Sequence, residues 1–120
     1  MNKIVKMLIS ETIHNNLIVH TNTIAGDKYS IFDKNHNEIL SVIDGWATNV
    51  YSIYVNNKNI LSVRWDETNS KPLTKDQKDM LDIINAVKEK MDLQETAQTM
   101  NHNELEIATF LQQSLCNVKH

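Results

Sequence analysis

The residues of this chain that most resemble a metal site lie between positions 33 and 44. Asp33, Asn35 and Asn37 offer oxygen atoms at alternate positions, which is how a calcium-binding loop begins. The pattern then departs from such a loop, because Glu38 stands where glycine makes the sharp turn and Asp44 stands where a bidentate glutamate is needed. A polar turn between two strands accounts for the same residues. We therefore predict no calcium site here.

Imidazole and thiol groups are present, but their spacing does not indicate a zinc site. The chain has five histidines and one cysteine, which are His14, His20, His36, His102, His120 and Cys116. No two histidines are spaced as ligands on one turn of a helix, and there is no second cysteine to join the first. A single cysteine cannot form an internal disulfide, which fits a reducing compartment. We predict surface histidines, no metal, no cofactor and a cytoplasmic location.

Nucleophilic catalysis and phosphate binding both lack the glycine-rich backbone that they commonly use. The chain contains two glycines, and no serine lies in a glycine-flanked turn. Oxyanion loops and phosphate-binding loops bring backbone N–H groups close to the ligand, and glycine makes that approach easy. We therefore predict that the protein is not an enzyme. An enzyme of unfamiliar type stays as the third alternative.

The elements that would position any site are dominated by a repeated pattern. Residues 29–32 are YSIF and residues 51–54 are YSIY, and each run is followed by a polar turn and then by ILSV. Short runs that alternate apolar and polar residues, and that are rich in β-branched and aromatic types, are typical of β-strands. The sequence therefore predicts two similar β-hairpins in tandem.

The same alternation assigns the side chains of the hairpins to two faces. One face is apolar and is predicted to be the core side, with Tyr29, Ile31, Leu40, Val42, Tyr51, Ile53, Leu61 and Val63. The other face carries one serine from each strand, Ser30, Ser41, Ser52 and Ser62, which is typical of a sheet surface that meets solvent. Phe32, Tyr54 and Arg64 share this serine face.

Aromatic residues and arginine are the residue types that anchor protein partners. Trp46 and Trp65 are either core residues or an extension of the aromatic residues on the serine face. The predicted partner-binding or ligand-binding residues are therefore Phe32, Trp46, Tyr54, Arg64 and Trp65.

The segments on either side of the hairpins complete the predicted fold. Residues 2–10 fit both a helical stripe and an alternating strand, and we favour a strand because of their β-branched content. Residues 17–24 are predicted to form the next strand, which ends before a turn at Gly26. Residues 66–71 and Pro72 are predicted to form a linker.

The chain after Leu73 contains neither glycine nor proline and is predicted to be helical. Thr74 and Gln77 form a capping box, and an apolar stripe follows at Met80, Ile83, Ile84, Val87 and Met91. We expect a change of direction at residues 101–103 and a last helix with Leu105, Ala108, Leu111 and Leu115 on its stripe.

The predicted fold class is α+β. It is an antiparallel meander of four to six strands packed against two or three C-terminal α-helices. We predict a single domain over residues 1–120, with a sheet half at 1–66 and a helical half at 73–118.

The charge of the chain argues against nucleic acid and membranes as partners. The formal net charge is −3, and Arg64 is the only arginine, whereas phosphate binding depends on a basic surface. No apolar run approaches the roughly 20 residues that a membrane helix needs. We therefore expect no nucleic acid and no membrane among its partners.

These observations favour a non-enzymatic protein that binds and inhibits or escorts a protein partner. The size, acidity and content of asparagine and lysine are broadly similar to those of immunity proteins of toxin systems and phage-encoded inhibitors of host defence. The alternative is a dimer that binds or sequesters a small ligand such as a nucleotide, with a base stacked on an aromatic ring. Homodimerisation is plausible because Ile107, Phe110 and Val118 lie off the predicted stripe of the last helix.

Overall fold

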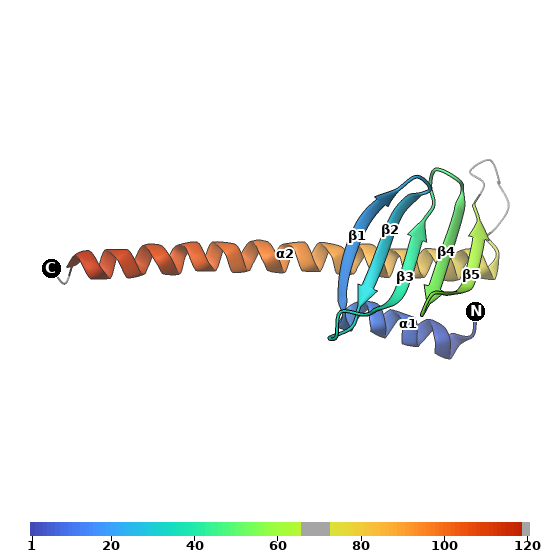
Figure 1. The fold of residues 1–120 in the computed structure, drawn as a ribbon, viewed down its shortest axis with the longest axis horizontal. Coiled ribbons are helices and arrows are strands. Elements are labelled where there is room, and N and C mark those ends of the chain that lie inside the picture. The colour runs from blue at the N-terminus through green and yellow to red at the C-terminus, as the bar shows by residue number, and fades with distance from the viewer. Residues whose placement is uncertain (66–72, 119–120) are drawn as a thin grey trace. The chain divides into compact units, whose positions relative to one another are not determined.

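The structure is a computed structural model that describes the backbone of residues 1–65 and 73–118, and the side chains of residues 1–65 and 73–97. The described elements are α1 (Lys3–Asn15), β1 (Leu17–Thr23), β2 (Gly26–Phe32), β3 (Glu38–Asp44), β4 (Val50–Val55), β5 (Lys58–Arg64) and α2 (Lys75–Val118) (Figure 1). The chain forms two compact units, Met1–Lys90 and Met91–His120. The predicted α+β class is confirmed. The predicted linker at residues 66–72 lies outside the described residues.

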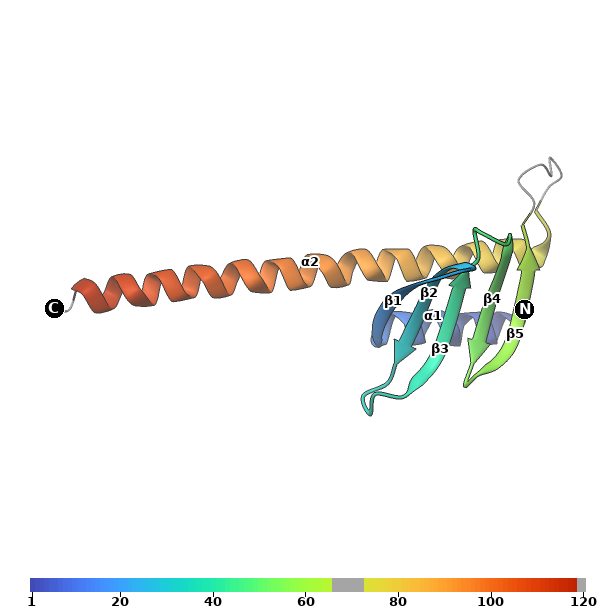
Figure 2. The ribbon, with the colours of Figure 1, turned by 45° about the horizontal axis from the view of Figure 1, so that its top comes forward.

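The five strands form one antiparallel sheet in the order β1-β2-β3-β4-β5 (Figure 2). The two predicted hairpins are β2 with β3 and β4 with β5, and the repeat extends to their irregularities. The register shifts between Ile31 and Phe32 in the first hairpin and between Ile53 and Tyr54 in the second, which are equivalent positions of the two copies. The repeated residues therefore form repeated structure, including the bulge that twists each hairpin.

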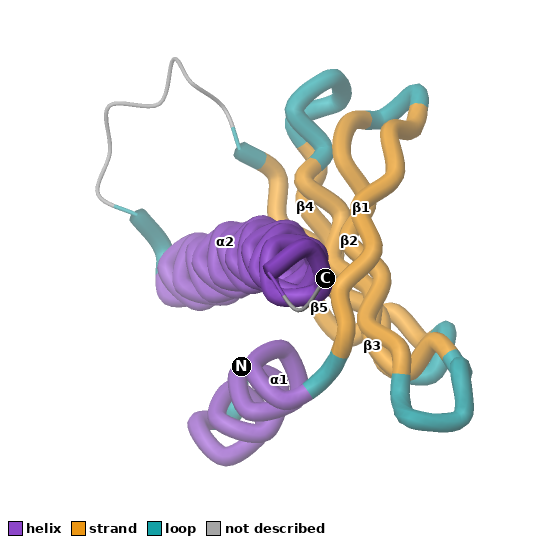
Figure 3. The backbone as a smooth tube through the Cα atoms, turned by 90° about the vertical axis from the view of Figure 1, so that its left-hand side faces the viewer, coloured by secondary structure: helices purple, strands orange, loops and turns teal. Residues whose placement is uncertain are grey.

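The core of the first unit lies between one face of the sheet and two helical segments. Figure 3 shows α1 and the first turns of α2 on the same side of the strands. The sheet contributes Ile18, Tyr29, Ile31, Leu40, Val42, Ile53 and Val63, all buried, and the helices contribute Ile9, Ile13, Met80, Ile83, Ile84 and Val87. The predicted core face is confirmed for Tyr29, Ile31, Leu40, Val42, Ile53 and Val63. Tyr51 and Leu61 are half-buried.

The prediction of a strand at residues 2–10 is wrong, because these residues form most of α1. Asn2 caps the helix, and its side chain accepts a hydrogen bond of 2.7 Å from the backbone N–H of Ile4. A strand would have buried Met7 together with Ile9, but the structure exposes Met7 and buries Ile9 and Ile13. That spacing of four residues places the buried side chains on one face of a helix.

The start of α2 is as predicted, but a break within it is not observed. The Gln77 N–H donates to Thr74 Oγ1 over 3.1 Å, and the Thr74 N–H donates to Gln77 Oε1 over 2.9 Å, which is a complete capping box. The helix continues through residues 101–103, because an asparagine inside a helix costs well under about 1 kcal/mol. The side chains of Leu105, Ala108, Leu111 and Leu115 lie outside the described residues.

Candidate functional site

A cleft opens in the first unit between one end of the sheet and α2. It has a volume of about 480 Å³. Its lining residues come from both hairpins, from the segment between them, from the end of β5 and from α2, and they are Asp27, Asp44, Trp46, Tyr51, Trp65, Leu81, Ile84 and Lys88. The cleft therefore combines aromatic rings, two carboxylates, one ammonium group and an aliphatic surface.

The loop that carries Trp46 is held by close backbone contacts. Gly26 has φ of 145°, and a Cβ atom at this position would lie 2.2 Å from the carbonyl oxygen of Asp44 and 3.0 Å from the backbone nitrogen of Trp46. At the other side of the loop, the Trp65 N–H donates to the carbonyl of Asn49 over 2.7 Å. The close approach of Asp44 and Trp46 requires glycine at position 26. The hydrogen bond from Trp65 fixes the other side of the loop.

The two carboxylates of the cleft occupy facing positions, since Asp27 and Asp44 are directly paired across β2 and β3. Like charges at such positions are destabilising. Asp27 Oδ2 accepts a hydrogen bond of 3.1 Å from Trp46 Nε1, and its Oδ1 lies 2.8 Å from His20 Nε2. Asp44 Oδ2 lies 3.4 Å from Lys88 Nζ, and the Lys88 side chain is 54% exposed. The buried carboxylate of Asp44 is therefore paired with an exposed ammonium group at the end of a flexible side chain.

Tyr29 shares the electrostatic environment of this carboxylate pair. Its ring stacks on His20, with ring centroids 5.0 Å apart and an interplanar angle of 20°. Burial raises the pKa of the Tyr29 hydroxyl above its usual value, and the negative charges of Asp27 and Asp44 raise it further. The hydroxyl is therefore protonated at neutral pH and contributes no charge of its own.

Aromatic rings form much of the remaining lining of the cleft. Tyr51 and Trp65 meet edge to face, with centroids 6.1 Å apart and an interplanar angle of 68°. Trp46 is 61% exposed, so a large part of its ring is open to a ligand. An aromatic face attracts cations as well as flat apolar groups.

The opposite face of the sheet, the open face, is not covered by α1 or by the described part of α2 in the first unit (Figure 3). Ser30 and Ser41 are paired across β2 and β3, and both are buried although they point away from the helices. Larger side chains beside them account for this burial, because Val19 pairs with Ser30 and Tyr54 with Ser41. The prediction that the serines of this face meet solvent is therefore wrong for Ser30, Ser41 and Ser52, which are all buried, and holds for Ser62.

Apolar side chains are exposed on the same open face. Leu17, Val19 and Val50 have exposed fractions of 51%, 43% and 40%. Phe32 pairs with Leu17 and Tyr54 pairs with Ser41, and both of these aromatic side chains are half-buried. Ser52 and Ser62 meet across β4 and β5, where their hydroxyl oxygens are 3.1 Å apart.

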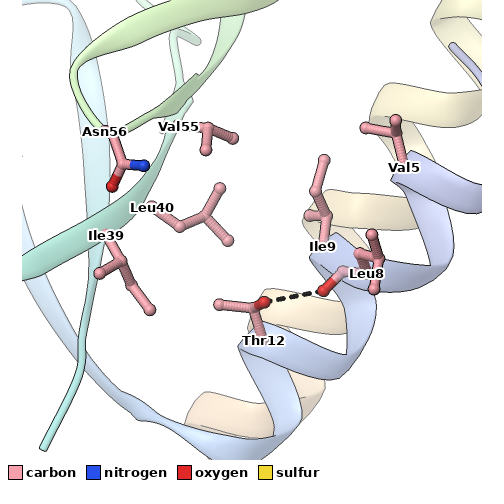
Figure 4. A pocket seen from close by; sticks show the side chains of 8 residues that line it. All are labelled: Val5, Leu8, Ile9, Thr12, Ile39, Leu40, Val55 and Asn56. Carbon is pink, nitrogen blue, oxygen red and sulfur yellow. Dashed lines mark hydrogen bonds between the residues drawn. The ribbon is translucent and has the colours of Figure 1, made fainter.

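A second hollow lies between α1 and the part of the sheet where β3 begins and β4 ends (Figure 4). Its volume is about 310 Å³, and its lining is almost entirely aliphatic, from Val5, Leu8, Ile9, Thr12, Ile39, Leu40, Val55 and Asn56. The hydroxyl of Thr12 donates to the carbonyl of Leu8 over 2.7 Å. The Thr12 hydroxyl is therefore already hydrogen-bonded within α1. The hollow offers a polar ligand few hydrogen-bonding groups.

The five predicted site residues fall into two groups. Phe32, Tyr54 and Arg64 lie on the open face, as their alternation with the core residues predicted. Trp46 and Trp65 line the cleft on the helix side of the sheet. The structure therefore does not bring all five together into one patch.

Sequence reasoning did not identify Asp27, Asp44, Tyr51 and Lys88 as site residues. A signal for the facing carboxylates was present, because counting outward from the pair Ser30 and Ser41 leads to Asp27 opposite Asp44. Lys88 is four residues beyond Ile84 on α2 and thus on a neighbouring position of the same face.

The turn that resembled the start of a calcium loop is explained by its own hydrogen bonds. Asp33 Oδ1 accepts from the backbone N–H groups of Asn35 and Asn37, each over 2.9 Å. The bond from the Asn37 backbone is the main cause that lowers the pKa of the Asp33 carboxyl. Within residues 1–65 and 73–97, no group of three or more histidine, cysteine, aspartate or glutamate side chains is arranged to hold a metal ion.

No protein-family model, curated protein or solved structure matches this chain. Among the described residues, no helix is both long and apolar enough to cross a membrane.

Proposed function

We propose that this chain is a non-enzymatic binding protein that inhibits or escorts a protein partner through the open face of its sheet. The observation that supports the proposal is the exposure of apolar side chains on a face that the described helices of the first unit leave uncovered. Exposed apolar surface of this kind commonly marks a contact site for another protein.

The shape and chemistry of the open face favour a macromolecule over a small ligand. Small-molecule sites are concave, whereas the two hollows described above both lie on the helix side of the sheet. Tyr54, Phe32 and Arg64 are the residue types that supply most binding energy at protein interfaces. The Lys28 ammonium lies 3.6 Å from the Glu38 carboxylate, so one of the charges near the open face is already paired.

The broad similarity to immunity proteins and phage-encoded inhibitors of host defence makes a toxin or a defence protein the class of partner we propose. The single cysteine is the basis for proposing a cytoplasmic setting.

The proposal is tested with variants of the open face. Tyr54→Ala and Arg64→Ala should leave the melting temperature nearly unchanged, because Arg64 is exposed and Tyr54 is only half-buried. The matched controls are Leu8→Ala on α1 and Lys78→Ala on α2, which remove exposed side chains elsewhere.

Affinity purification from the native host then compares the variants with the unaltered protein. A partner that is retained by both controls and lost with both open-face variants supports the proposal. Retention of every co-purifying protein by the open-face variants argues against it, as does loss of the fold in both.

The second candidate function is binding of a small ligand, for which the cleft with Trp46 and Trp65 is the supporting feature. A nucleotide is the ligand first expected from the aromatic rings, but the facing carboxylates would repel its phosphates. A thermal-shift screen with nucleotides tests this alternative, because a ligand that binds the folded state raises the melting temperature.

Homodimerisation belongs to the same alternative, and it rests on Ile107, Phe110 and Val118, whose side chains lie outside the described residues. Light scattering tests it directly.

A further inference from the structure

The cleft beside α2 has an excess of negative charge among its charged lining groups. Asp27 and Asp44 face each other, and Lys88 is the cation that lines the cleft with them. Lys88 Nζ lies 3.4 Å from Asp44 Oδ2, which is longer than the roughly 2.7–2.9 Å of a strong charge-assisted hydrogen bond, and the Lys88 side chain is 54% exposed. Lys88 therefore holds its place near Asp44 loosely, and a competing cation can displace it.

The aromatic lining narrows the class of cation that the cleft suits. A metal ion needs several oxygen, nitrogen or sulfur ligands around one point, whereas Trp46, Tyr51 and Trp65 line the cleft with aromatic rings. An organic cation can use both features at once, with its charge toward a carboxylate and its flat surface on a ring. Guanidinium is the best match, since it is planar, stacks on aromatic rings and forms paired hydrogen bonds with carboxylates.

We propose that this cleft binds a guanidinium group, which contacts Asp44 and stacks on the tryptophan rings while Lys88 swings away. The guanidinium comes from free arginine or from an arginine side chain of a peptide. This site is on the helix side of the sheet, so the proposal stands independently of partner binding at the open face.

The two tryptophans of the chain both line the cleft, so tryptophan fluorescence reports directly on its occupancy. The full chain is titrated at constant ionic strength with free arginine, with the blocked tripeptide acetyl-Gly-Arg-Gly-amide and with its lysine counterpart. We expect saturable binding of an arginine probe with a dissociation constant of about 1 mM, which corresponds to about −4 kcal/mol. Binding of free arginine identifies a small-molecule site, and binding of the peptide alone identifies an arginine of a partner.

Three substitutions test the geometry. Asp44→Asn keeps the shape of the side chain and should weaken arginine binding about tenfold, because the charged partner of the guanidinium is lost. Lys88→Met should tighten binding severalfold, because it removes the competing cation but keeps the aliphatic stem. Glu89→Gln is the matched control, since it removes an exposed carboxylate on α2 that does not line the cleft, and it should change nothing.

The opposite result at Lys88 overturns the proposal. If Lys88→Met weakens the binding of the arginine probes, or if AMP binds and Lys88→Met abolishes that binding, the site is made for an anion. Equal binding of the lysine peptide, unchanged binding by Asp44→Asn, or no saturable signal also overturns it. Circular dichroism of each variant establishes that it is folded, and Lys88→Met provides the decisive comparison if Asp44→Asn unfolds, because Lys88 is exposed.

Discussion

Replacement of Lys6 by methionine is expected to destabilise the protein far more than an ordinary surface substitution. Lys6 Nζ on α1 reaches two carboxylates of α2, at 3.0 Å from Asp79 Oδ1 and 2.6 Å from Asp82 Oδ2. The Asp79 side chain is only 8% exposed, whereas that of Asp82 is 59% exposed. Lys6→Met therefore leaves one carboxylate buried without its lysine, while the other is hydrated by water.

The expected loss follows from the burial of Asp79. Removing one partner of a buried ion pair lowers the free energy of unfolding by about 3–5 kcal/mol. A hydrogen bond to a charged group contributes about 1.5–3 kcal/mol. The lower range applies here, because the Lys6 side chain is 29% exposed and the amino nitrogen of Met1 lies 3.1 Å from Asp79 Oδ2. We expect the free energy of unfolding to fall by about 2 kcal/mol at pH 7.

The effect of Lys6→Met should depend on pH. Hydrogen bonding to Lys6 lowers the pKa of Asp79 in the folded protein, against the opposing effect of burial. A lowered folded pKa stabilises the protein above the unfolded pKa of about 4, and this stability is lost as the pH falls through the folded pKa.

Hydrogen bonds to Asp82 and then Asp79 raise the pKa of Lys6. That contribution is complete below the unfolded pKa of about 10.4 and is lost as the pH rises through the folded value. The difference between Lys6→Met and the unaltered protein should therefore be largest between these limits and should narrow in acid and in alkali.

Urea denaturation followed by circular dichroism from pH 3 to 12 measures the difference. The matched control is Lys3→Met, which makes the same change at an exposed position of the same helix and should cost less than about 0.5 kcal/mol. Equal losses in the two variants at pH 7, or a Lys6→Met loss that grows in acid, would refute the role assigned to the ion pair.

Four further substitutions test the remaining architecture, each by denaturant or thermal unfolding. Ile9→Ala should cost about 2–5 kcal/mol because Ile9 is buried, whereas Met7→Ala, at an exposed position of α1, should cost less than about 1 kcal/mol; a strand would place both side chains on one face and give similar losses. Gly26→Ala should cost more than about 2 kcal/mol, because its Cβ would overlap the carbonyl of Asp44, and a neutral result would contradict the turn. Thr74→Ala should cost about 1 kcal/mol through loss of the capping box, and an unchanged stability would place the start of α2 elsewhere.

The hairpins and the start of α2 could be predicted because their signals are local. Alternation with a period of two specifies which side chains share a face, and Thr74 with Gln77 specifies a helix start within four residues. At the N-terminus the local signals conflict. Val5 and Ile9 are four residues apart, which is compatible with one face of a helix and with one face of a strand. The contacts that decide between them are made with α2, far along the chain.

The cleft could not be predicted from local patterns for a related reason. Asp27, Asp44 and Lys88 come together only once the register of β2 with β3 and the packing of α2 are both known. Trp46 lies in a loop, where no periodicity assigns a side chain to a face. The positive φ of Asn49, 60°, and the bond from Trp65 to its carbonyl set the path of that loop.

The open face and the cleft beside α2 lie on opposite sides of the sheet. Tyr54 and Arg64 point away from the helices, and Asp44 and Lys88 point toward the cleft. Among the described residues, no hydrogen bond or ion pair links the two pairs. Substitutions without shared partners usually act additively. Tyr54→Ala should therefore leave arginine binding in the cleft unchanged, and Asp44→Asn should leave capture of a protein partner unchanged. Loss of both activities in either variant would mean that one ligand spans both sides or that the sheet itself has been disrupted, and unfolding measurements separate these two explanations.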